Sequence, residues 1–244
     1  MESLAQELLD AIIDHVPSPH AHSCSLVARR WRKRAQQRVF KDLQLMFLRE
    51  DDLVRWSRDI PQDPDGTPSY IQHVEFRNIL YWSGPGILGR VLKCLSRVKV
   101  LAFCRAVIPC GEVLNIVSSG AFGRELTSLV LTGPHPTMST LMPLISSPPN
   151  LRELTIICDP SSPKAPMPLA PEHVWKRGPL LSLKLSGLLG EEIEYIARCG
   201  ITSRKLDLYM GDGMIEKLVA CSSETVEKLA VSGAWLLWNS TAWE

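Results

Sequence analysis

The chain has 244 residues, of which 45% are hydrophobic and 22% charged, and 27 basic residues are balanced by 26 acidic ones. This composition is typical of a globular protein with a buried core, and the near-neutral charge argues against a general affinity for polyanions. No uncharged apolar run reaches the roughly 18–20 residues of a membrane span, and the N-terminal MESLAQELL does not resemble a signal peptide. The seven cysteines are scattered, so we expect reduced and mostly buried thiols.

The first forty residues predict three short helices with more apolar surface than they can bury. In residues 4–16 one apolar stripe recurs every four positions, at Leu4, Leu8, Ile12 and Val16. Leu9 and Ile13 form a second stripe beside it. A second helix is predicted to begin at Ser18, and a third to contain Trp31. Because so short a segment cannot cover all of these side chains, we expect a partner protein to cover some of them.

The third of these helices contains RRWRKRAQQR, residues 29–38, with six basic residues in ten positions. The charges fall on several faces of the helix, and only Gln36 and Gln37 could read bases, so a nucleic-acid-binding helix is not favoured. Solvated charge, a nuclear-import signal and a surface that attracts an acidic protein partner remain open.

From residue 40 onwards one pattern recurs eight times: an apolar residue, two residues, an apolar residue, one residue, an apolar residue. The central members are Leu43, Val74, Leu101, Leu129, Leu154, Leu183, Leu206 and Leu229, at intervals of 23 to 31 residues. The last two apolar positions alternate as in a strand, and helix-like segments lie between repeats at 86–95, 190–200 and 212–221. One strand and one helix per repeat predict a solenoid of the leucine-rich-repeat type.

Residues 40–234 thus resemble the leucine-rich-repeat family, with irregular turns expected. That family usually carries Asn or Cys three residues after the third apolar position. Those positions hold Ala106, Pro134, Asp159, Leu188, Gly211 and Ala234. Two proline-rich stretches interrupt the period: 133–150 leaves room for a short helix, and 159–171 is expected to be an exposed loop. After the last repeat, apolar residues 235–238 indicate either a lid or a truncated, uncapped end.

The N-terminal segment LAQELLDAIID…CSLVARRWRKRAQQRVFKDLQL resembles an F-box, and closely that of mushroom-forming fungi. The family opens with Leu-Pro-x-Glu-Leu-Leu, continues with paired aliphatic residues and a Cys/Ser-Leu-Val core, and ends with a Trp and an aromatic residue. The matching residues are Leu4, Glu7, Leu8, Ile12, Ile13, Cys24, Leu26, Val27, Trp31 and Phe40. Ala5 replaces the family proline, the following loop is short, and Ala21 stands where the family tends to have leucine.

The two resemblances together imply an α+β protein, with a three-helix F-box in residues 1–45 and an α/β leucine-rich-repeat-like solenoid in residues 46–244. They imply a non-catalytic substrate receptor of an SCF-type cullin–RING ubiquitin ligase, cytoplasmic or nuclear, without cofactors. The partners would be a Skp-family adaptor, through it a cullin, and a protein target; nucleic acid and membrane are not expected. The implied adaptor-binding residues are Leu4, Leu8, Ile12, Val16, Leu26, Val27 and Trp31. The first alternative is an interaction scaffold with no role in degradation.

A second alternative is a dinucleotide-binding enzyme, because Gly84, Gly86 and Gly89 match G-x-G-x-x-G at the start of a helix. However, no strand enters the turn before Gly84, and no acidic residue follows at the ribose position. The His and Cys residues lack the paired spacing of zinc ligands, and no Gly-x-Ser-x-Gly elbow is present. We therefore predict neither a metal site nor a catalytic site.

Overall fold

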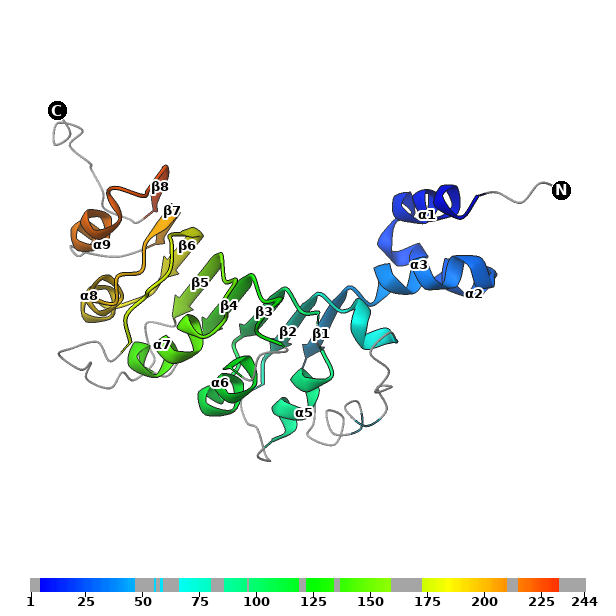
Figure 1. Ribbon diagram of the computed structural model, residues 1–244, viewed down its shortest axis with the longest axis horizontal. Coiled ribbons are helices and arrows are strands. Elements are labelled where there is room, and N and C mark those ends of the chain that lie inside the picture. Colours follow the sequence, from blue (N-terminus) through cyan, green and yellow to red (C-terminus); the bar gives the residue numbers. More distant parts are fainter. Residues whose placement is uncertain are drawn as a thin grey trace.

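The computed structural model describes residues 5–46, 55, 58, 66–79, 86–95, 97–118, 122–133, 137–158, 173–209 and 215–232. This part contains eight α-helices, a short 3-10 helix and an eight-stranded parallel sheet. Strands and helices alternate over most of the chain, so the class is α/β overall, and the expected α+β class is corrected accordingly. In Figure 1 the strands lie side by side along an arc, and three helices form a separate unit at its N-terminal end.

The three helices predicted in the first forty residues are present. They are α1 (Gln6–His15), α2 (Ser18–Val27) and α3 (Arg29–Val39). The 3-10 helix η1 (Thr67–Tyr70), which the sequence did not predict, contacts α3 and precedes the second strand of the sheet. Within the described part of the chain, none of the helices combines the length and the apolarity needed to cross a bilayer.

The eight strands pair in chain order, and all are parallel. They are β1 (Asp42–Met46), β2 (His73–Arg77), β3 (Val100–Cys104), β4 (Ser128–Gly133), β5 (Glu153–Cys158), β6 (Leu180–Ser186), β7 (Ser203–Tyr209) and β8 (Lys228–Ser232). The central residues of successive repeats are register partners throughout, from the pair Leu43 and Val74 to the pair Leu206 and Leu229. The repeat found in the sequence therefore corresponds to the sheet residue by residue.

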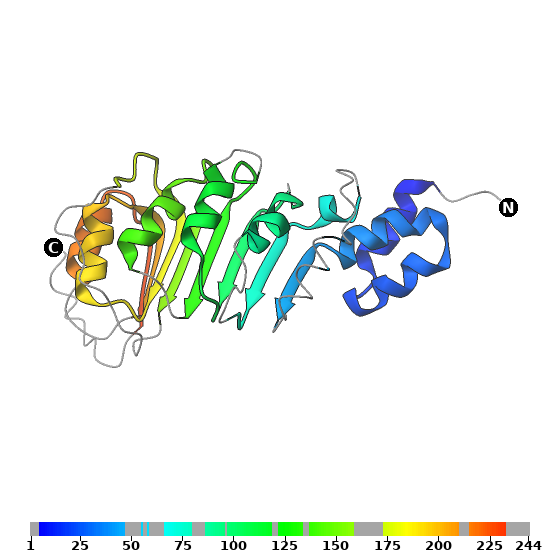
Figure 2. The same ribbon diagram turned by 90° about the horizontal axis from the view of Figure 1, so that it is seen from below.

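Five helices cover one face of the sheet, on the outer side of the arc (Figures 1 and 2). They are α5 (Ile87–Lys93), α6 (Cys110–Ser118), α7 (Met138–Ser146), α8 (Gly190–Arg198) and α9 (Ile215–Ser222). The second and third apolar positions of the inner repeats point into this layer and are buried; Phe76 and Phe103, for example, stack with ring centroids 5.3 Å apart. The alternate positions form the inner face, which no described helix covers.

The helices predicted from the sequence match four of these elements. Residues 86–95 and 190–200 contain α5 and α8, residues 212–221 cover α9 except for its last residue, and the proline-rich stretch 133–150 contains α7. Helix α6 was not predicted. The expected loop at 159–171 and the apolar residues 235–238 lie outside the described residues.

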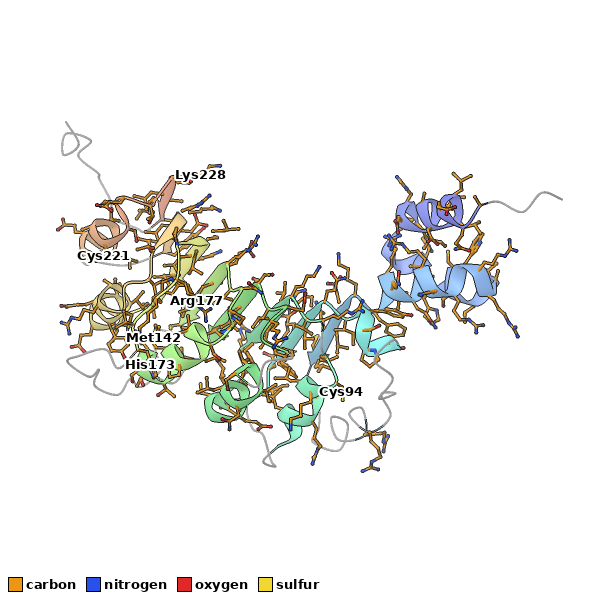
Figure 3. All side chains as sticks on the ribbon, in the orientation of Figure 1. Cys94, Met142, His173, Arg177, Cys221 and Lys228 are labelled. Atoms are coloured by element: carbon orange, nitrogen blue, oxygen red, sulfur yellow. The ribbon has the colours of Figure 1, made fainter. Side chains whose placement is uncertain are left out.

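The segment that follows the second proline-rich stretch is tied to the end of α7 through Arg177 (Figure 3). The Arg177 Nη2 donates hydrogen bonds to the carbonyl oxygens of Ser146, at 2.5 Å, and Ser147, at 3.1 Å. Its guanidinium also lies 5.4 Å from the ring centroid of the buried Trp175. Arg177 thus binds carbonyl oxygens that the last turn of a helix leaves without partners.

The turns after the strands are more regular than expected. In four repeats the residue two positions after the third apolar residue has a positive φ: Asn78 (56°), Arg105 (52°), Gly133 (115°) and Gly187 (67°). Three of these residues donate their N–H to a carbonyl at the end of the next strand; the Asn78 N–H, for example, lies 2.9 Å from the Cys104 oxygen. Buried Ala106 and Leu188 occupy two of the positions where the family has a polar side chain. The backbone conformation of these four turns is therefore alike, whereas the side chains at the family's polar position differ from the family pattern, as the sequence indicated.

Candidate functional site

The helical unit is assembled around α3, which contacts both α1 and α2. Leu9 and Ile13 of α1 are buried, and so are Ala21 of α2 and Ala35 of α3. The second apolar stripe of α1 therefore packs inward, against helices whose contact positions include two small alanines. Ala21, a departure from the F-box pattern, is one of these core residues.

The first apolar stripe of α1 and the end of α2 face solvent. The exposed fractions are 55% for Leu8, 47% for Ile12, 71% for Leu26 and 68% for Val27. The Gln6 Nε2 donates a hydrogen bond to the Arg30 carbonyl oxygen at 3.2 Å, so α1 begins beside the junction of α2 and α3. We name these four residues the apolar face of the helical unit. Large exposed apolar side chains gathered on one small unit are typical of a protein-binding surface.

Six of the seven residues expected to bind an adaptor lie in the described part of the chain. Four of them form the apolar face, and Val16 and Trp31 are half-buried. Leu4 lies outside the described residues. Part of the Trp31 side chain is therefore accessible, as an adaptor-binding residue requires.

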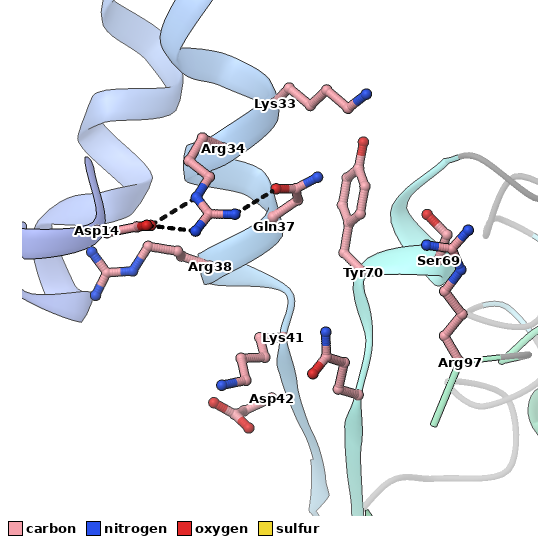
Figure 4. A pocket seen from close by; sticks show the side chains of 11 residues that line it. Asp14, Lys33, Arg34, Gln37, Arg38, Lys41, Asp42, Ser69, Tyr70 and Arg97 are labelled. Carbon is pink, nitrogen blue, oxygen red and sulfur yellow. Dashed lines mark hydrogen bonds and ion pairs between the residues drawn. The ribbon is translucent and has the colours of Figure 1, made fainter. Parts of the chain in front are cut away.

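Two basic residues of RRWRKRAQQR hold α1 to α3. The Arg34 Nε and Nη2 donate to the two carboxylate oxygens of Asp14 at 2.7 and 2.5 Å (Figure 4). This bidentate hydrogen bonding lowers the pKa of Asp14 and raises that of Arg34. The Arg38 Nη1 donates to the carbonyl oxygens of Ile13 and, at 2.6 Å, Val16, where α1 ends. Arg34 and Arg38 are therefore not simply solvated charges, one of the alternatives open for this helix, because both bind α1.

A basic cleft of about 890 Å³ lies between the helical unit and the start of the sheet (Figure 4). Its walls are Asp14, Lys33, Arg34, Gln37, Arg38, Lys41, Asp42, Ser69, Tyr70, Gln72 and Arg97. Arg34 and Arg38 are engaged as described above, which leaves Lys33, Lys41 and Arg97 without an ion-pair partner among the described residues. Lys33, from α3, and Tyr70, from η1, extend toward each other across the opening (Figure 4). The cleft can accept an anionic group.

The sequence did not reveal this cleft, because its walls come from α1, α3, η1 and the segments before β1, β2 and β3. In the sequence, only the positive charge of residues 29–38 pointed to this region. That charge pattern does not show that Arg34 and Arg38 bind α1 whereas Lys33 has no ion-pair partner in the described part of the chain.

The inner face of the sheet is charged at both ends and weakly polar in the middle. At one end Arg77 Nη2 lies 2.6 Å from Glu75 Oε1. At the other end Lys205 Nζ lies 3.0 Å from Asp207 Oδ2, and Lys228 extends from β8 (Figure 3). The intervening positions on β3, β4 and β5 are Val100, Ala102, Cys104, Ser128, Val130, Thr132, Glu153, Thr155 and Ile157. Apart from Glu153 at the start of β5, these strands offer small apolar, thiol and hydroxyl side chains between two charged borders, a pattern common in protein interfaces.

The glycine-rich segment does not form a free phosphate cradle in the structure. Gly86, with a φ of 84°, precedes α5, which has only seven residues. The Gly89 N–H donates a hydrogen bond to the Glu112 carboxylate. A negative charge therefore already lies at a position where a dinucleotide would place its phosphates. Gly84 lies outside the described residues.

The thiols and potential metal ligands are dispersed. All seven cysteines are described, and none forms a disulfide; Cys110, Cys158 and Cys199 are buried, fewer than expected. Burial raises the pKa of Cys110 and of Cys199 to about 11, which keeps both protonated and poorly nucleophilic at neutral pH. In the described part of the chain, no three His, Cys, Asp or Glu side chains converge as a metal site would require.

Comparisons with known proteins add no family assignment. The chain matches no protein-family model, and a search of curated proteins found no similar sequence.

Proposed function

We propose that the chain is an F-box protein, the substrate receptor of an SCF-type cullin–RING ubiquitin ligase, with no catalytic role of its own. The observation that carries this proposal is the apolar face of the helical unit, Leu8, Ile12, Leu26 and Val27. These residues are among those in which the N-terminal segment resembles an F-box, and the Skp-family adaptor is the partner that would cover them.

The exposed fractions of these side chains indicate how much binding free energy the adaptor could gain by covering them. Fully burying a large aliphatic side chain contributes about 1.5–3 kcal/mol. Since about half or more of each of these four side chains is exposed, covering them contributes roughly 4 kcal/mol in total. This corresponds to about a thousandfold in affinity.

The shape of the chain is consistent with one end binding the adaptor and the sheet binding a target. The helical unit lies at one end of the arc, and the inner face of the sheet, resembling a leucine-rich-repeat surface, is free of described helices (Figure 1). A target bound to that face would be held near the ubiquitin-transfer machinery that the adaptor and cullin bring. The receptor would act by raising the effective concentration of the target, not by supplying a chemical group.

Isothermal titration of the purified chain with a purified Skp-family adaptor tests the proposal. Leu8→Asp and Leu26→Asp should each weaken binding at least about a hundredfold, because each places a carboxylate in the apolar contact. Leu189→Asp is the matched control, because Leu189 is 51% exposed but lies before α8, far along the chain from the helical unit. The proposal fails if the wild type does not bind, or if all three variants bind like the wild type.

A further inference from the structure

A row of cationic side chains begins in the basic cleft and follows the edge at which the strands start. The residues just before the inner-face positions form a ladder of backbone hydrogen bonds. Each of these residues is one rung of the ladder, and from the second rung onwards its N–H donates a hydrogen bond of 2.7 to 2.9 Å to the carbonyl oxygen of the preceding rung. In chain order the rungs are Lys41, Gln72, Lys99, Thr127, Arg152 and Leu181. Leu180 pairs with Ser203 and Ser182 with Lys205, which places Arg204 on the rung after Leu181.

Cations occupy every second rung of this ladder. They are Lys41, Lys99, Arg152 and Arg204, and all four are exposed. Neighbouring strands are about 4.8 Å apart, so successive cations are about 10 Å apart. Lys41, Lys99 and Arg152 have no ion-pair partner among the described residues, whereas Arg204 Nε lies 3.8 Å from Glu227 Oε1. We name these four residues the cationic row.

This spacing fits a polyproline-II helix better than other extended polyanions. A polyproline-II helix has three residues per turn and rises about 3.1 Å per residue, so every third side chain points the same way about 9.3 Å further on. A β-strand repeats its direction after about 6.6–6.8 Å. A nucleic-acid strand carries a charge about every 3.4 Å along its axis. Asp42 and Glu153, next to Lys41 and Arg152, would also repel a continuous phosphate backbone.

The cleft supplies a suitable end for such a ligand. Lys41 and Gln72 belong both to the ladder and to the cleft, where Lys33 and Arg97 add positive charge. Tyr70 presents an aromatic ring in the same cleft, and proline-rich segments dock on aromatic side chains. The cationic row and the cleft therefore adjoin at Lys41, and together they offer positive charge and the aromatic ring of Tyr70.

We propose that the cleft and the cationic row bind an extended, proline-rich protein segment that carries a carboxylate at every third position. The row covers seven rungs and therefore six strand spacings, about 29 Å, which a polyproline-II segment covers in about nine residues. This binding does not depend on the adaptor, so it holds or fails separately from the function proposed above.

The test uses fluorescence anisotropy with the full chain and two labelled twelve-residue peptides of identical composition. In the first, Glu-Pro-Pro is repeated four times; in the second, the four glutamates are consecutive and the eight prolines follow. The first should bind at least about tenfold more tightly, and its affinity should fall as salt is added. A single-stranded oligonucleotide of twelve nucleotides is the third probe, and it should bind more weakly than the spaced peptide.

The triple variant Lys41→Gln, Lys99→Gln, Arg152→Gln should weaken binding of the spaced peptide about tenfold or more. The matched control replaces Arg90, Lys93 and Arg198 with Gln; it removes the same charge from exposed positions on α5 and α8 and should bind like the wild type. Thermal melting of both variants checks that these exposed substitutions leave the fold intact. Equal affinity for the two peptides, equal loss in the two variants, tighter binding of the oligonucleotide, or no binding of the spaced peptide would each overturn the proposal.

Discussion

Replacing Arg38 with glutamine tests whether part of the basic cluster has a structural role. Helix α1 has ten residues, a length at which an isolated helix is marginal in water, so its stability depends on tertiary contacts. The Arg38 guanidinium donates to two carbonyl oxygens at the end of α1, those of Ile13 and Val16. A hydrogen bond from a charged group contributes about 1.5–3 kcal/mol, so Arg38→Gln should destabilise α1 locally by about 2 kcal/mol. This corresponds to roughly a thirtyfold change in its opening equilibrium.

Hydrogen exchange followed by mass spectrometry measures this local opening. Amides of α1 should exchange roughly thirtyfold faster in Arg38→Gln than in the wild type, while those of β3, β4 and β5 should be unchanged. Arg32→Gln is the control, because Arg32 is exposed on the same helix and such a change typically costs less than about 0.5 kcal/mol. If α1 exchanges at the same rate in both variants, the structural role assigned to Arg38 is refuted.

Three further predictions concern the sheet. Gly133→Ala should lower the free energy of unfolding in urea by about 1–3 kcal/mol, because the φ of Gly133 is 115° and the new Cβ would lie 2.8 Å from a backbone atom. The control Gly111→Ala should not be destabilising, because a Cβ at this position of α6 meets open space. Phe103→Ala, at a fully buried position, should cost about 3–5 kcal/mol in the same assay, and a cost below 1 kcal/mol would contradict the packing described. Burial tends to raise the pKa of Glu75, but hydrogen bonds, chiefly from Arg77, outweigh it and leave the pKa below its ordinary value of 4.5. Ionised Glu75 therefore stabilises the fold above about pH 4.5, and this contribution is lost as pH falls through the lower folded-state pKa. Glu75→Gln should make acid unfolding shallower below that pH; an unchanged acid-unfolding curve would count against the Glu75–Arg77 pair.

The register of the sheet could be predicted from the sequence because each strand carries the same two apolar positions. Leucine at 129 and at 154 must both reach the layer under the helices, and a shift of one residue would turn each to the inner face. For α1 the helical period alone separates two apolar stripes but does not say which one packs inward; the F-box resemblance implied that Leu8 and Ile12 face a partner, and both are exposed.

The cleft and the cationic row could not be predicted, because they are brought together by the stacking of repeats. Lys41, Lys99 and Arg152 are far apart in the sequence and lie in no local pattern, yet they occupy alternate rungs of one ladder. The positive φ of Asn78 and Arg105 was equally hidden, since neither residue type demands that conformation. For the cationic row and for the turn residues alike, the stacking of repeats places residues of different types at equivalent structural positions.

The central claim is that the helical unit recruits a ubiquitin ligase. Affinity purification of the tagged chain from cells, followed by mass spectrometry, tests it most directly. We predict that the wild type recovers a Skp-family adaptor together with a cullin, and that the double variant Leu8→Asp, Leu26→Asp recovers neither while remaining folded. Recovery of the two proteins by the double variant at the level of the wild type, or their absence from the wild-type sample, would contradict the account.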